Sequence, residues 1–200
     1  MLHFPTIIYR KIRFALVCCG RISQNHVAAI AQHHERAELV AVCDSNAQAL
    51  AATVKATGAR GFTHLDQLLD SSDADVIVLA TPSGLHPNQT VLCAEAGKHV
   101  MTEKPMATRW TDAKRMVTAC DAAHRRLFVV KQNRRNATLQ LLKNAVESGR
   151  FGRIYMVSMN VFWQRPQEYY DSATWRGTWE FDGGAFMNQA SHYVDLLDWL

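Results

Sequence analysis

Glu103, Lys104 and Pro105 place a carboxylate, an amine and a proline directly after the apolar run "HVMT". Such a run is typical of a buried strand in a parallel sheet, so the three residues emerge at its carboxyl end. At the rim of an apolar pocket the ammonium form of lysine is disfavoured, which lowers the pKa and suits the amine to proton transfer. Lys104 is therefore a candidate base that Glu103 can orient, with a solvated surface lysine as the alternative. Pro105 fixes the chain direction, and a cis peptide bond is an option there.

A second cluster with chemical potential is "GGAFMNQASHYVD" at residues 183–195. Asn188 and His192 are four residues apart, so they share one face of the helix that we predict over 185–200. A histidine with a hydrogen-bonding neighbour suits proton transfer. The alternative is a core histidine on an amphipathic helix, which the spacing alone slightly favours.

The stretch "VCCGRIS", Val17 to Ser23, stands where a dinucleotide-binding turn is expected. The G-x-G-x-x-G/A pattern needs a tight bend, close backbone approach to a pyrophosphate and a small residue where helix meets strand. Gly20 supplies the middle glycine and Ser23 is small enough for the third position. Cys18 departs from the pattern, because its Cβ strains a turn that glycine makes freely. The cofactor-binding residues predicted in the turn are Gly20, Arg21 and Ile22.

Two further segments support a cofactor site. Asp44 closes the second predicted strand. Its separation from Gly20 in the sequence is close to the roughly 20 residues expected of a carboxylate that binds ribose hydroxyls. No arginine follows it for a 2′-phosphate, so NAD is favoured over NADP; the alternative is that Asp44 caps the next helix. Thr81, Pro82 and His86 follow the third clear strand, at the edge where ligands bind in open parallel sheets. The alternative for His86 is a helix-start residue beside Pro87.

Strands and helices alternate over about 130 residues, which predicts βαβ units, a parallel sheet and a doubly wound Rossmann fold of the α/β class. The predicted strands are 12–19, 37–44, 74–82, 98–105 and 127–132, with a weaker one near residue 62; the predicted helices are 20–34, 46–58, 86–97 and 111–126.

The pattern changes near residue 134, so we predict a Rossmann domain over 11–132 and a second domain over 133–200. The second domain is predicted to contain a helix over 134–149 and a strand at Arg153–Trp163 whose apolar and polar residues alternate. One alternating strand cannot form a stable sheet, since about three strands are needed. We therefore expect 133–200 to be the start of an incomplete α+β substrate domain.

The composition excludes several classes of protein. The chain has 200 residues and a net charge of +4 with scattered basic residues, which argues against nucleic-acid binding. The five cysteines lack C-x-x-C spacing, so buried thiols are expected and zinc is not. No apolar run reaches the roughly 18 residues of a membrane span, and the N-terminus makes a poor signal peptide. We expect no metal, no membrane partner and a cytoplasmic location.

The chain resembles the Gfo/Idh/MocA oxidoreductase family over nearly its whole length. The resemblance rests on four motifs in the family's order: the turn, the T-P-x-x-x-H segment, E-K-P and the G-G…H helix. The stretches "MTEKPMATRW", "VVKQNRRNATLQLLK" and 162–200 are similar to its bacterial UDP-N-acetyl-2-amino-2-deoxyglucuronate dehydrogenases. Those enzymes oxidise the sugar 3-hydroxyl with NAD in lipopolysaccharide O-antigen synthesis. The resemblance implies a catalytic pair, Lys104 as base and His192 positioning the hydroxyl, with NAD bound by the segments above, including Glu103 and Lys104.

The resemblance also implies a UDP-sugar acid, whose diphosphate and carboxylate call for arginines. Tetramers are the family expectation for the full-length protein. Two other interpretations stay open: a dehydrogenase of a free polyol or sugar, and an NAD-binding remnant without catalysis. The substrate-binding candidates are Lys104, Asn133, Arg134, Arg165, Tyr169, Trp175, Arg176, Asn188 and His192, with Arg135 a further arginine of the same segment.

Overall fold

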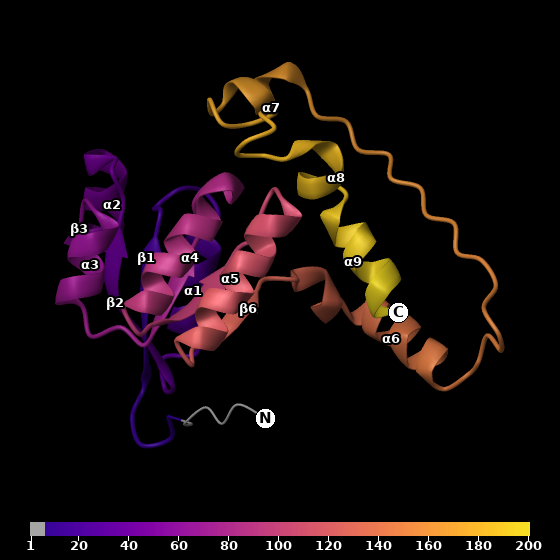
Figure 1. Cartoon of the computed structure of the whole chain (residues 1–200), viewed down its shortest axis with the longest axis horizontal. Helices are drawn as coiled ribbons and strands as arrows, with labels where there is room; N and C mark the ends of the chain where they lie inside the picture. The colour runs from indigo at the N-terminus through magenta and orange to yellow at the C-terminus, as the bar shows by residue number, and fades with distance from the viewer. Residues whose placement is uncertain (1–6) are drawn as a thin grey trace. The chain divides into compact units, whose positions relative to one another are not determined.

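The structure is a computed structural model that describes residues 7–200, and these residues form two compact units that meet in the sequence between Val129 and Val130. The expected boundary at residue 132 lies a few residues further along the chain. Each unit has its own helices (Figure 1).

The described part of the first unit contains a six-stranded parallel sheet of order β3-β2-β1-β4-β5-β6. This is the strand order of the Rossmann fold, and the sequence predicted that fold. The weaker strand expected near residue 62 is β3, at one edge of this sheet. The strands are β1 (Ile12–Val17), β2 (Ala37–Cys43), β3 (Arg60–Phe62), β4 (Val76–Leu79), β5 (His99–Thr102) and β6 (Leu127–Val129).

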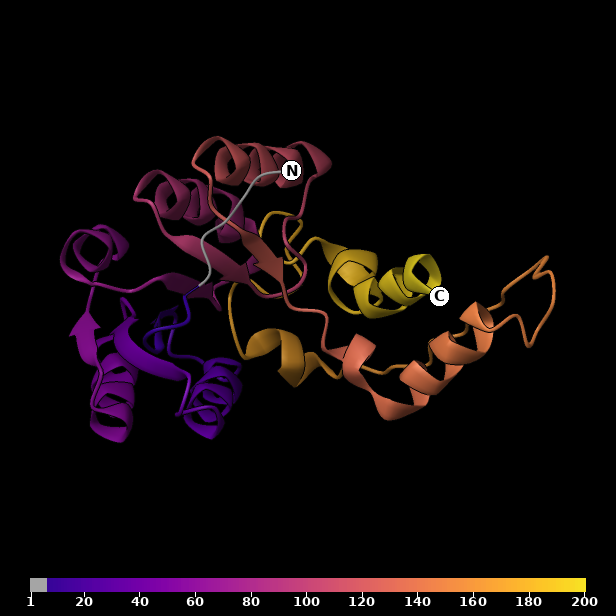
Figure 2. The ribbon, with the colours of Figure 1, turned by 90° about the horizontal axis from the view of Figure 1, so that it is seen from below.

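Helices cover both faces of this sheet (Figures 1 and 2). They are α1 (Ser23–Gln32), α2 (Ala47–Thr57), α3 (Leu65–Ser71), α4 (His86–Glu95) and α5 (Trp110–Ala122), with a 3-10 turn η1 (Ser83–Leu85) before α4. The short helix α3 was not predicted. Its seven residues are too few for a helical apolar period to be recognised.

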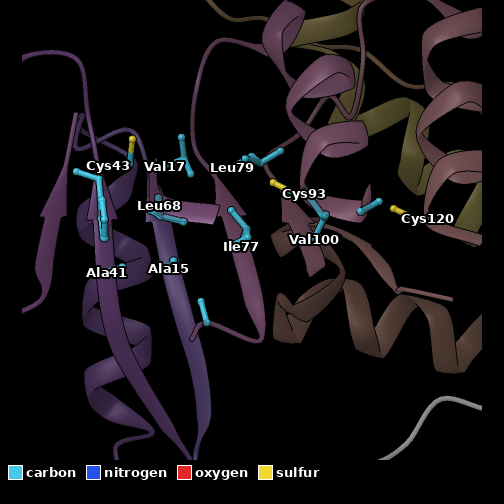
Figure 3. Packing of buried hydrophobic residues seen from close by; sticks show 13 residues of the cluster. Ala15, Val17, Ala41, Cys43, Leu68, Ile77, Leu79, Cys93, Val100 and Cys120 are labelled. Atoms are coloured by element: carbon cyan, nitrogen blue, oxygen red, sulfur yellow. The ribbon is translucent and has the colours of Figure 1, made fainter. Parts of the chain in front are cut away.

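The alternation of side chains along the central strands builds two cores. Ala15 and Val17 of β1 belong to one buried cluster that extends across the sheet and also contains Leu68 of α3, Cys93 of α4 and Cys120 of α5 (Figure 3). Leu16 faces the other way, toward the helices α1 and α2. Burying both faces explains why these strands are near-continuous apolar runs in the sequence.

The buried thiols belong to the same cores. Four of the cysteines are buried and Cys18 is half-buried, and all five are free, as the sequence predicted. Burial raises the pKa of Cys43 to about 11 and that of Cys93 to about 12. These thiols therefore stay protonated near neutral pH.

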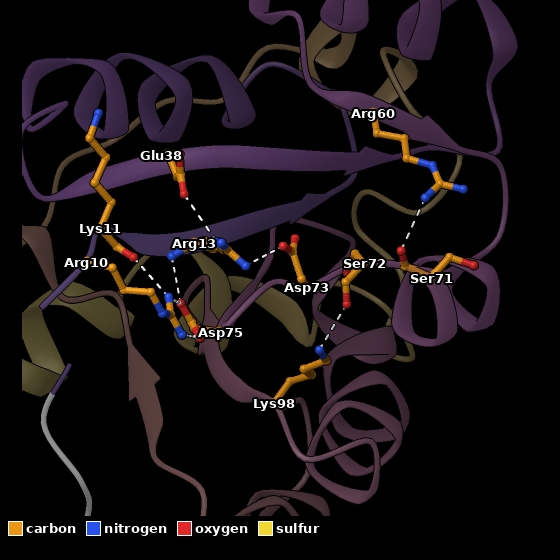
Figure 4. Close-up of polar contacts among 10 residues, drawn as sticks. All are labelled: Arg10, Lys11, Arg13, Glu38, Arg60, Ser71, Ser72, Asp73, Asp75 and Lys98. Atoms are coloured by element: carbon orange, nitrogen blue, oxygen red, sulfur yellow. Dashed lines mark hydrogen bonds and ion pairs between the residues drawn. The ribbon is translucent and has the colours of Figure 1, made fainter.

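Polar contacts tie the amino ends of β1 and β4 together, at the edge opposite the carboxyl ends of the strands (Figure 4). The Asp75 carboxylate accepts two hydrogen bonds from the Arg10 guanidinium, at 2.6 and 2.7 Å, and a third from the Arg13 backbone N–H at 2.8 Å. Burial acts against them, but these donors lower the pKa of Asp75 below its ordinary value. These contacts hold β1 and β4 in register at the end of the sheet opposite the candidate site.

The second unit consists of short helices and an extended segment. Its elements are the 3-10 turn η2 (Gln132–Arg135) and the helices α6 (Ala137–Glu147), α7 (Gln167–Asp171), α8 (Gly184–Asn188) and α9 (Ser191–Trp199). The helix predicted over 134–149 is thus η2 followed by α6, and Asn136 caps α6 by accepting a hydrogen bond from the N–H of Thr138. Helix α7 was not predicted, because its five residues are too few for a helical apolar period to be recognised.

Two predictions for this unit are wrong. Residues 153–163 run as an extended chain that pairs with no strand among residues 7–200, because an alternating pattern defines two strand faces but supplies no partner (Figure 1). The single helix predicted over 185–200 is two helices, α8 and α9. The Ser191 hydroxyl donates to the Asn188 carbonyl at 3.2 Å, and such side-chain bonds compete with a continuous helix.

Candidate active site

The carboxyl ends of β1, β4 and β5 bring three of the predicted segments together. The Ala80 N–H donates to the Val17 carbonyl at 3.0 Å, and the Glu103 N–H donates to the Leu79 carbonyl at 3.0 Å. The turn after β1, the Thr81–His86 segment after β4 and the tripeptide after β5 therefore leave the same edge of the sheet. This is the edge where open parallel sheets bind ligands.

The turn after β1 has the geometry of a glycine-rich loop with one unusual residue. Cys18 has a φ of 80°, a left-handed conformation that glycine adopts without strain. A Cβ on Gly20 would lie 3.4 Å from the Cys18 Sγ, an ordinary van der Waals contact, so the protein itself leaves this exposed position open. Ser23 is fully buried and its hydroxyl donates to the Gly20 carbonyl, which fits the predicted packing role.

Asp44 connects the end of β2 to this turn. Its Oδ2 accepts from the Cys19 N–H and its Oδ1 from the Asn46 N–H, both at 2.7 Å. The alternative that Asp44 caps α2 is wrong, because the Asn46 side chain accepts from Gln48 N–H and Ala49 N–H at the start of that helix. Each Asp44 oxygen retains acceptor capacity for a hydroxyl group.

These residues fit the cofactor that the turn predicts. Gly20, Arg21 and Ile22 are exposed. The Gly20 N–H donates to the Cys18 sulfur, whereas no hydrogen bond among the described residues uses the N–H groups of Arg21 and Ile22. Free N–H groups at the start of a ten-residue helix are suited to a pyrophosphate. A half-buried carboxylate beside them is suited to ribose hydroxyls. The donor and acceptor set therefore matches NAD.

The strain at Cys18 predicts a gain of affinity on replacement by glycine. Cys18→Gly should lower the Kd for NAD by about two- to fivefold, because a left-handed residue with a Cβ costs on the order of 1 kcal/mol. Cys18→Ala is the matched control, since it removes the sulfur but retains the Cβ and should not tighten binding. Isothermal titration calorimetry measures both, and equal Kd values for the two variants would refute the strain argument.

The tripeptide that carries Lys104 has a cis peptide bond between Lys104 and Pro105, the option that the sequence raised. Glu103 is 9% exposed, and its Oε1 lies 2.8 Å from the Nε2 of His26 on α1. Lys104 itself is half-buried at the end of β5. The carboxylate beside the candidate base thus has a partner from the helix that follows the cofactor turn.

His86 lies inside the first unit with none of its surface exposed. Its Nδ1 is 3.0 Å from the Pro105 carbonyl and its Nε2 is 2.9 Å from the Thr81 carbonyl. A neutral imidazole donates to only one of these two carbonyls. A ring with no exposed surface presents no face to a ligand, unlike the cofactor contact that we expected. The Thr81 hydroxyl donates to the Gln89 Oε1 at 2.6 Å, and Pro82 is half-buried before η1.

Burial of His86 predicts that the protein becomes less stable as the pH falls. Desolvation lowers the pKa of His86 from its ordinary 6.5, outweighing the two carbonyls that raise it. The unfolded chain then binds a proton below pH 6.5 that the folded chain does not, so stability is complete above this pH and declines below it. Urea unfolding between pH 7 and 5 should show a loss of up to about 1.4 kcal/mol per pH unit for this group. A His86→Asn variant should have a shallower slope, and a flat wild-type profile would contradict the assignment.

In the second unit, four predicted substrate residues lie in one aromatic and arginine cluster. Tyr169 has the guanidinium of Arg176 at 4.3 Å and that of Arg165 at 5.2 Å from its ring centre. Arg176 also lies 4.8 Å from the ring of Trp175. Gln189 connects the cluster, because it accepts from Arg165 at 2.9 Å and donates to the Tyr169 hydroxyl at 3.0 Å.

Arg134 is engaged in a different way. Its guanidinium donates to both oxygens of Asp195 on α9, at 2.9 and 2.8 Å, which lowers the pKa of Asp195. Lys131 lies 3.5 Å from the same carboxylate. Arg134 therefore joins η2 to α9, and its paired donors are already used. Asn133 lies half-buried in η2, and Arg135 is exposed there.

His192 and Asn188 are both buried in the second unit, at 7% and 9% exposure. They lie on α9 and α8 rather than on the one helix that we predicted. The Asn188 amide donates to Oδ1 of Asp182, and Oδ2 of Asp182 accepts from the Gly177 N–H at 2.8 Å. This buried carboxylate fixes Asn188 to the loop before α8.

Sequence reasoning missed His26, Asp182 and Gln189. A nearly buried carboxylate at Glu103 requires a partner, but nothing in the sequence marks a histidine 77 residues away as that partner. Asp182 precedes two glycines in "FDGG", a pattern that indicates a turn residue rather than a buried acceptor.

The described residues also bear on metals and membranes. Between residues 7 and 200 no three His, Cys, Asp or Glu side chains are grouped so that they could hold a metal ion. In the same part of the chain, no helix has both the length and the apolar character needed to span a bilayer.

The fold and the site define the class of protein. The profile of the oxidoreductase family Gfo/Idh/MocA, NAD-binding Rossmann fold, matches residues 12–131, and the profile of the family's C-terminal domain matches residues 139–200. The chain therefore belongs to the Gfo/Idh/MocA family, as its motifs predicted.

Two solved structures are about 70% identical to this chain in sequence. One is the WlbA dehydrogenase from Bordetella pertussis in complex with NADH and UDP-GlcNAcA, 71% identical with a TM-score of 0.96 over 98% of this chain and 56% of that one. The other is the WlbA protein from Chromobacterium violaceum with the same ligands, 68% identical with a TM-score of 0.98 over 100% and 58%.

A curated relative is more distant. Inositol 2-dehydrogenase 3 from Saccharopolyspora erythraea is 30% identical over 190 residues, which are 94% of this chain and 53% of that protein. The chain thus spans about half the length of these proteins.

Proposed function

We propose that this protein is an NAD-dependent dehydrogenase of UDP-N-acetylglucosaminuronic acid that oxidises the sugar 3-hydroxyl for the synthesis of lipopolysaccharide O-antigen sugars. The observation that carries the proposal is the identity of about 70% to two structures that contain NADH and UDP-GlcNAcA. The donor and acceptor set of the first unit supports it, because exposed N–H groups and Asp44 suit the cofactor.

The catalytic roles follow the family resemblance. Lys104 takes the proton of the 3-hydroxyl, and His192 positions that hydroxyl. When NAD is bound, it supplies the hydride acceptor. The surroundings of each residue support the assignment, since Lys104 is half-buried at the ligand-binding edge and His192 is buried on α9. A well-placed base of this kind contributes about 10² to 10⁴ in rate.

The aromatic and arginine cluster is the proposed binding surface for the UDP-sugar acid. Arg165 and Arg176 supply positive charge, and Tyr169 and Trp175 supply flat apolar faces. Lys104, Asn133, Asn188 and His192 are proposed for the sugar. We do not assign Arg134 to the diphosphate, although the sequence suggested it, because its Nε and Nη2 already donate to the two oxygens of Asp195.

A direct assay separates this proposal from its alternatives. The protein is mixed with NAD and UDP-N-acetylglucosaminuronic acid, and the absorbance of the reduced nicotinamide is followed. We expect reduction with the UDP-sugar acid and none with myo-inositol or glucose. Reduction with a free polyol alone would favour a polyol dehydrogenase, and NAD binding without turnover on either substrate would favour a non-catalytic binding protein.

Location and assembly are further proposals. NAD and nucleotide sugars are cytoplasmic metabolites, so we place the reaction in the cytoplasm. A homo-oligomer, a tetramer by family expectation, is proposed for the whole protein. Size-exclusion chromatography with light scattering measures the assembly, and a monomer at micromolar concentration would contradict it.

A further inference from the structure

The segment that carries Lys104 is held at both of its neighbours. On one side, the Glu103 N–H donates to the Leu79 carbonyl of β4 at 3.0 Å. On the other side, the Pro105 carbonyl lies 3.0 Å from Nδ1 of the fully buried His86. These contacts fix the backbone on either side of the proposed base.

The Glu103 side chain is held by a residue from a different helix. His26 Nε2 lies 2.8 Å from Glu103 Oε1, and the two side chains are only 13% and 11% exposed. A carboxylate so nearly removed from water is stable only with a partner, and His26 lies within hydrogen-bonding distance of it. The Glu103 orientation therefore depends on His26.

We propose that His26 is a positioning residue for Lys104, acting through the Glu103 carboxylate. This proposal rests on the proposed function, in which Lys104 is the base. His26 lies in the first turn of α1, the helix that begins at the cofactor turn. The contact thus links the element that meets the pyrophosphate to the element that carries the base. A lysine whose neighbours are displaced by even about 1 Å can lose on the order of 10² in rate.

The test compares His26→Phe, His26→Asn and His26→Gln with wild type. Phenylalanine keeps a ring but cannot donate, and asparagine is too short to span the contact. Glutamine has a donor at a similar reach, so it is the conservative variant. His34→Phe is the matched control, because His34 is an exposed histidine just beyond the end of the same helix.

We expect His26→Phe and His26→Asn to lower kcat by about 10- to 100-fold while KM changes by less than about threefold. His26→Gln should recover activity to within about fivefold of wild type, and His34→Phe should match wild type. Equal activity in all variants would overturn the proposal. So would a loss in His26→Gln as large as in His26→Phe, which indicates packing alone.

A measurement that needs no turnover distinguishes a failure of the positioning role of His26 from a failure of the proposed function. Brief acetylation with acetic anhydride at pH 8.5 and peptide mass spectrometry give the labelling of Lys104 relative to exposed Lys55 in the same sample. We expect this ratio to change at least about threefold in His26→Phe and to return to the wild-type value in His26→Gln, because the reactivity of a lysine amine depends on its surroundings. An unchanged ratio would overturn the positioning role even if the wild type showed no dehydrogenase activity, and a changed ratio would support it.

Discussion

Lys104→Met should lower kcat for NAD reduction by about 10³, because the variant keeps the length and apolar stem of the side chain but has no group to accept the proton. Its Kd for NAD should change less than about fivefold, since the N–H groups of the turn and Asp44 are intact. Steady-state kinetics with calorimetry on the same sample give both values.

The matched control for this variant is Lys98→Met. Lys98 immediately precedes β5, whose other end leads to Lys104, and its Nζ donates to the Ser72 carbonyl at 3.1 Å. The control should retain wild-type kcat, because it lies at the amino ends of the strands. Activity of Lys104→Met within threefold of Lys98→Met would show that the amine is not the base.

Asp44→Ala should raise the Kd for NAD by about 10- to 100-fold, because hydrogen bonds to a charged group contribute about 1.5 to 3 kcal/mol. The same change leaves the N–H groups of Cys19 and Asn46 without their acceptor, so the melting temperature should fall as well. Removal of the negative charge should also narrow the preference for NAD over NADP. Calorimetry with both cofactors, at a temperature where the variant is folded, measures these changes.

Asp70→Ala is the control for charge, since Asp70 is exposed on α3 in the same unit. It should bind NAD as the wild type does. If Asp44→Ala also bound NAD with wild-type affinity, the carboxylate would serve only to connect β2 to the turn, and the cofactor assignment for Asp44 would be wrong.

Much of the first unit was predictable from the sequence, and the reason is physical. Strands that are buried on both faces are apolar at most positions, so β1, β2 and β4 stand out as near-continuous apolar runs between helical patterns. Their order places the turn, Thr81 and Lys104 at one edge, which is why the candidate site could be assembled from separate motifs.

The errors occurred where local patterns do not determine partners. The stretch Arg153–Trp163 alternates as a strand does, but pairing is a property of a second segment that the pattern cannot reveal. For Arg134, which was predicted to bind substrate because arginine suits phosphates, the sequence did not reveal that Asp195, 61 residues away, pairs with it. Charge alone does not distinguish an ionic partner within the protein from one in a ligand.

The contact between His26 and Glu103 was missed for the same reason, because local sequence patterns do not determine side-chain partners. Both residues are polar members of well-predicted elements, and only the three-dimensional arrangement of α1 beside the end of β5 shows that they meet. The parts of the site that come from strand ends were therefore accessible to sequence reasoning, whereas the side-chain contacts that support them were not.

The most direct measurement of the proposed reaction follows a labelled hydrogen. UDP-N-acetylglucosaminuronic acid with deuterium at C3 is incubated with the protein and NAD, and the reduced cofactor is analysed by mass spectrometry. Oxidation of the 3-hydroxyl predicts that the deuterium is found on the reduced nicotinamide and that turnover slows relative to unlabelled substrate. Reduced cofactor without deuterium, with the label retained in the sugar, would contradict the assignment.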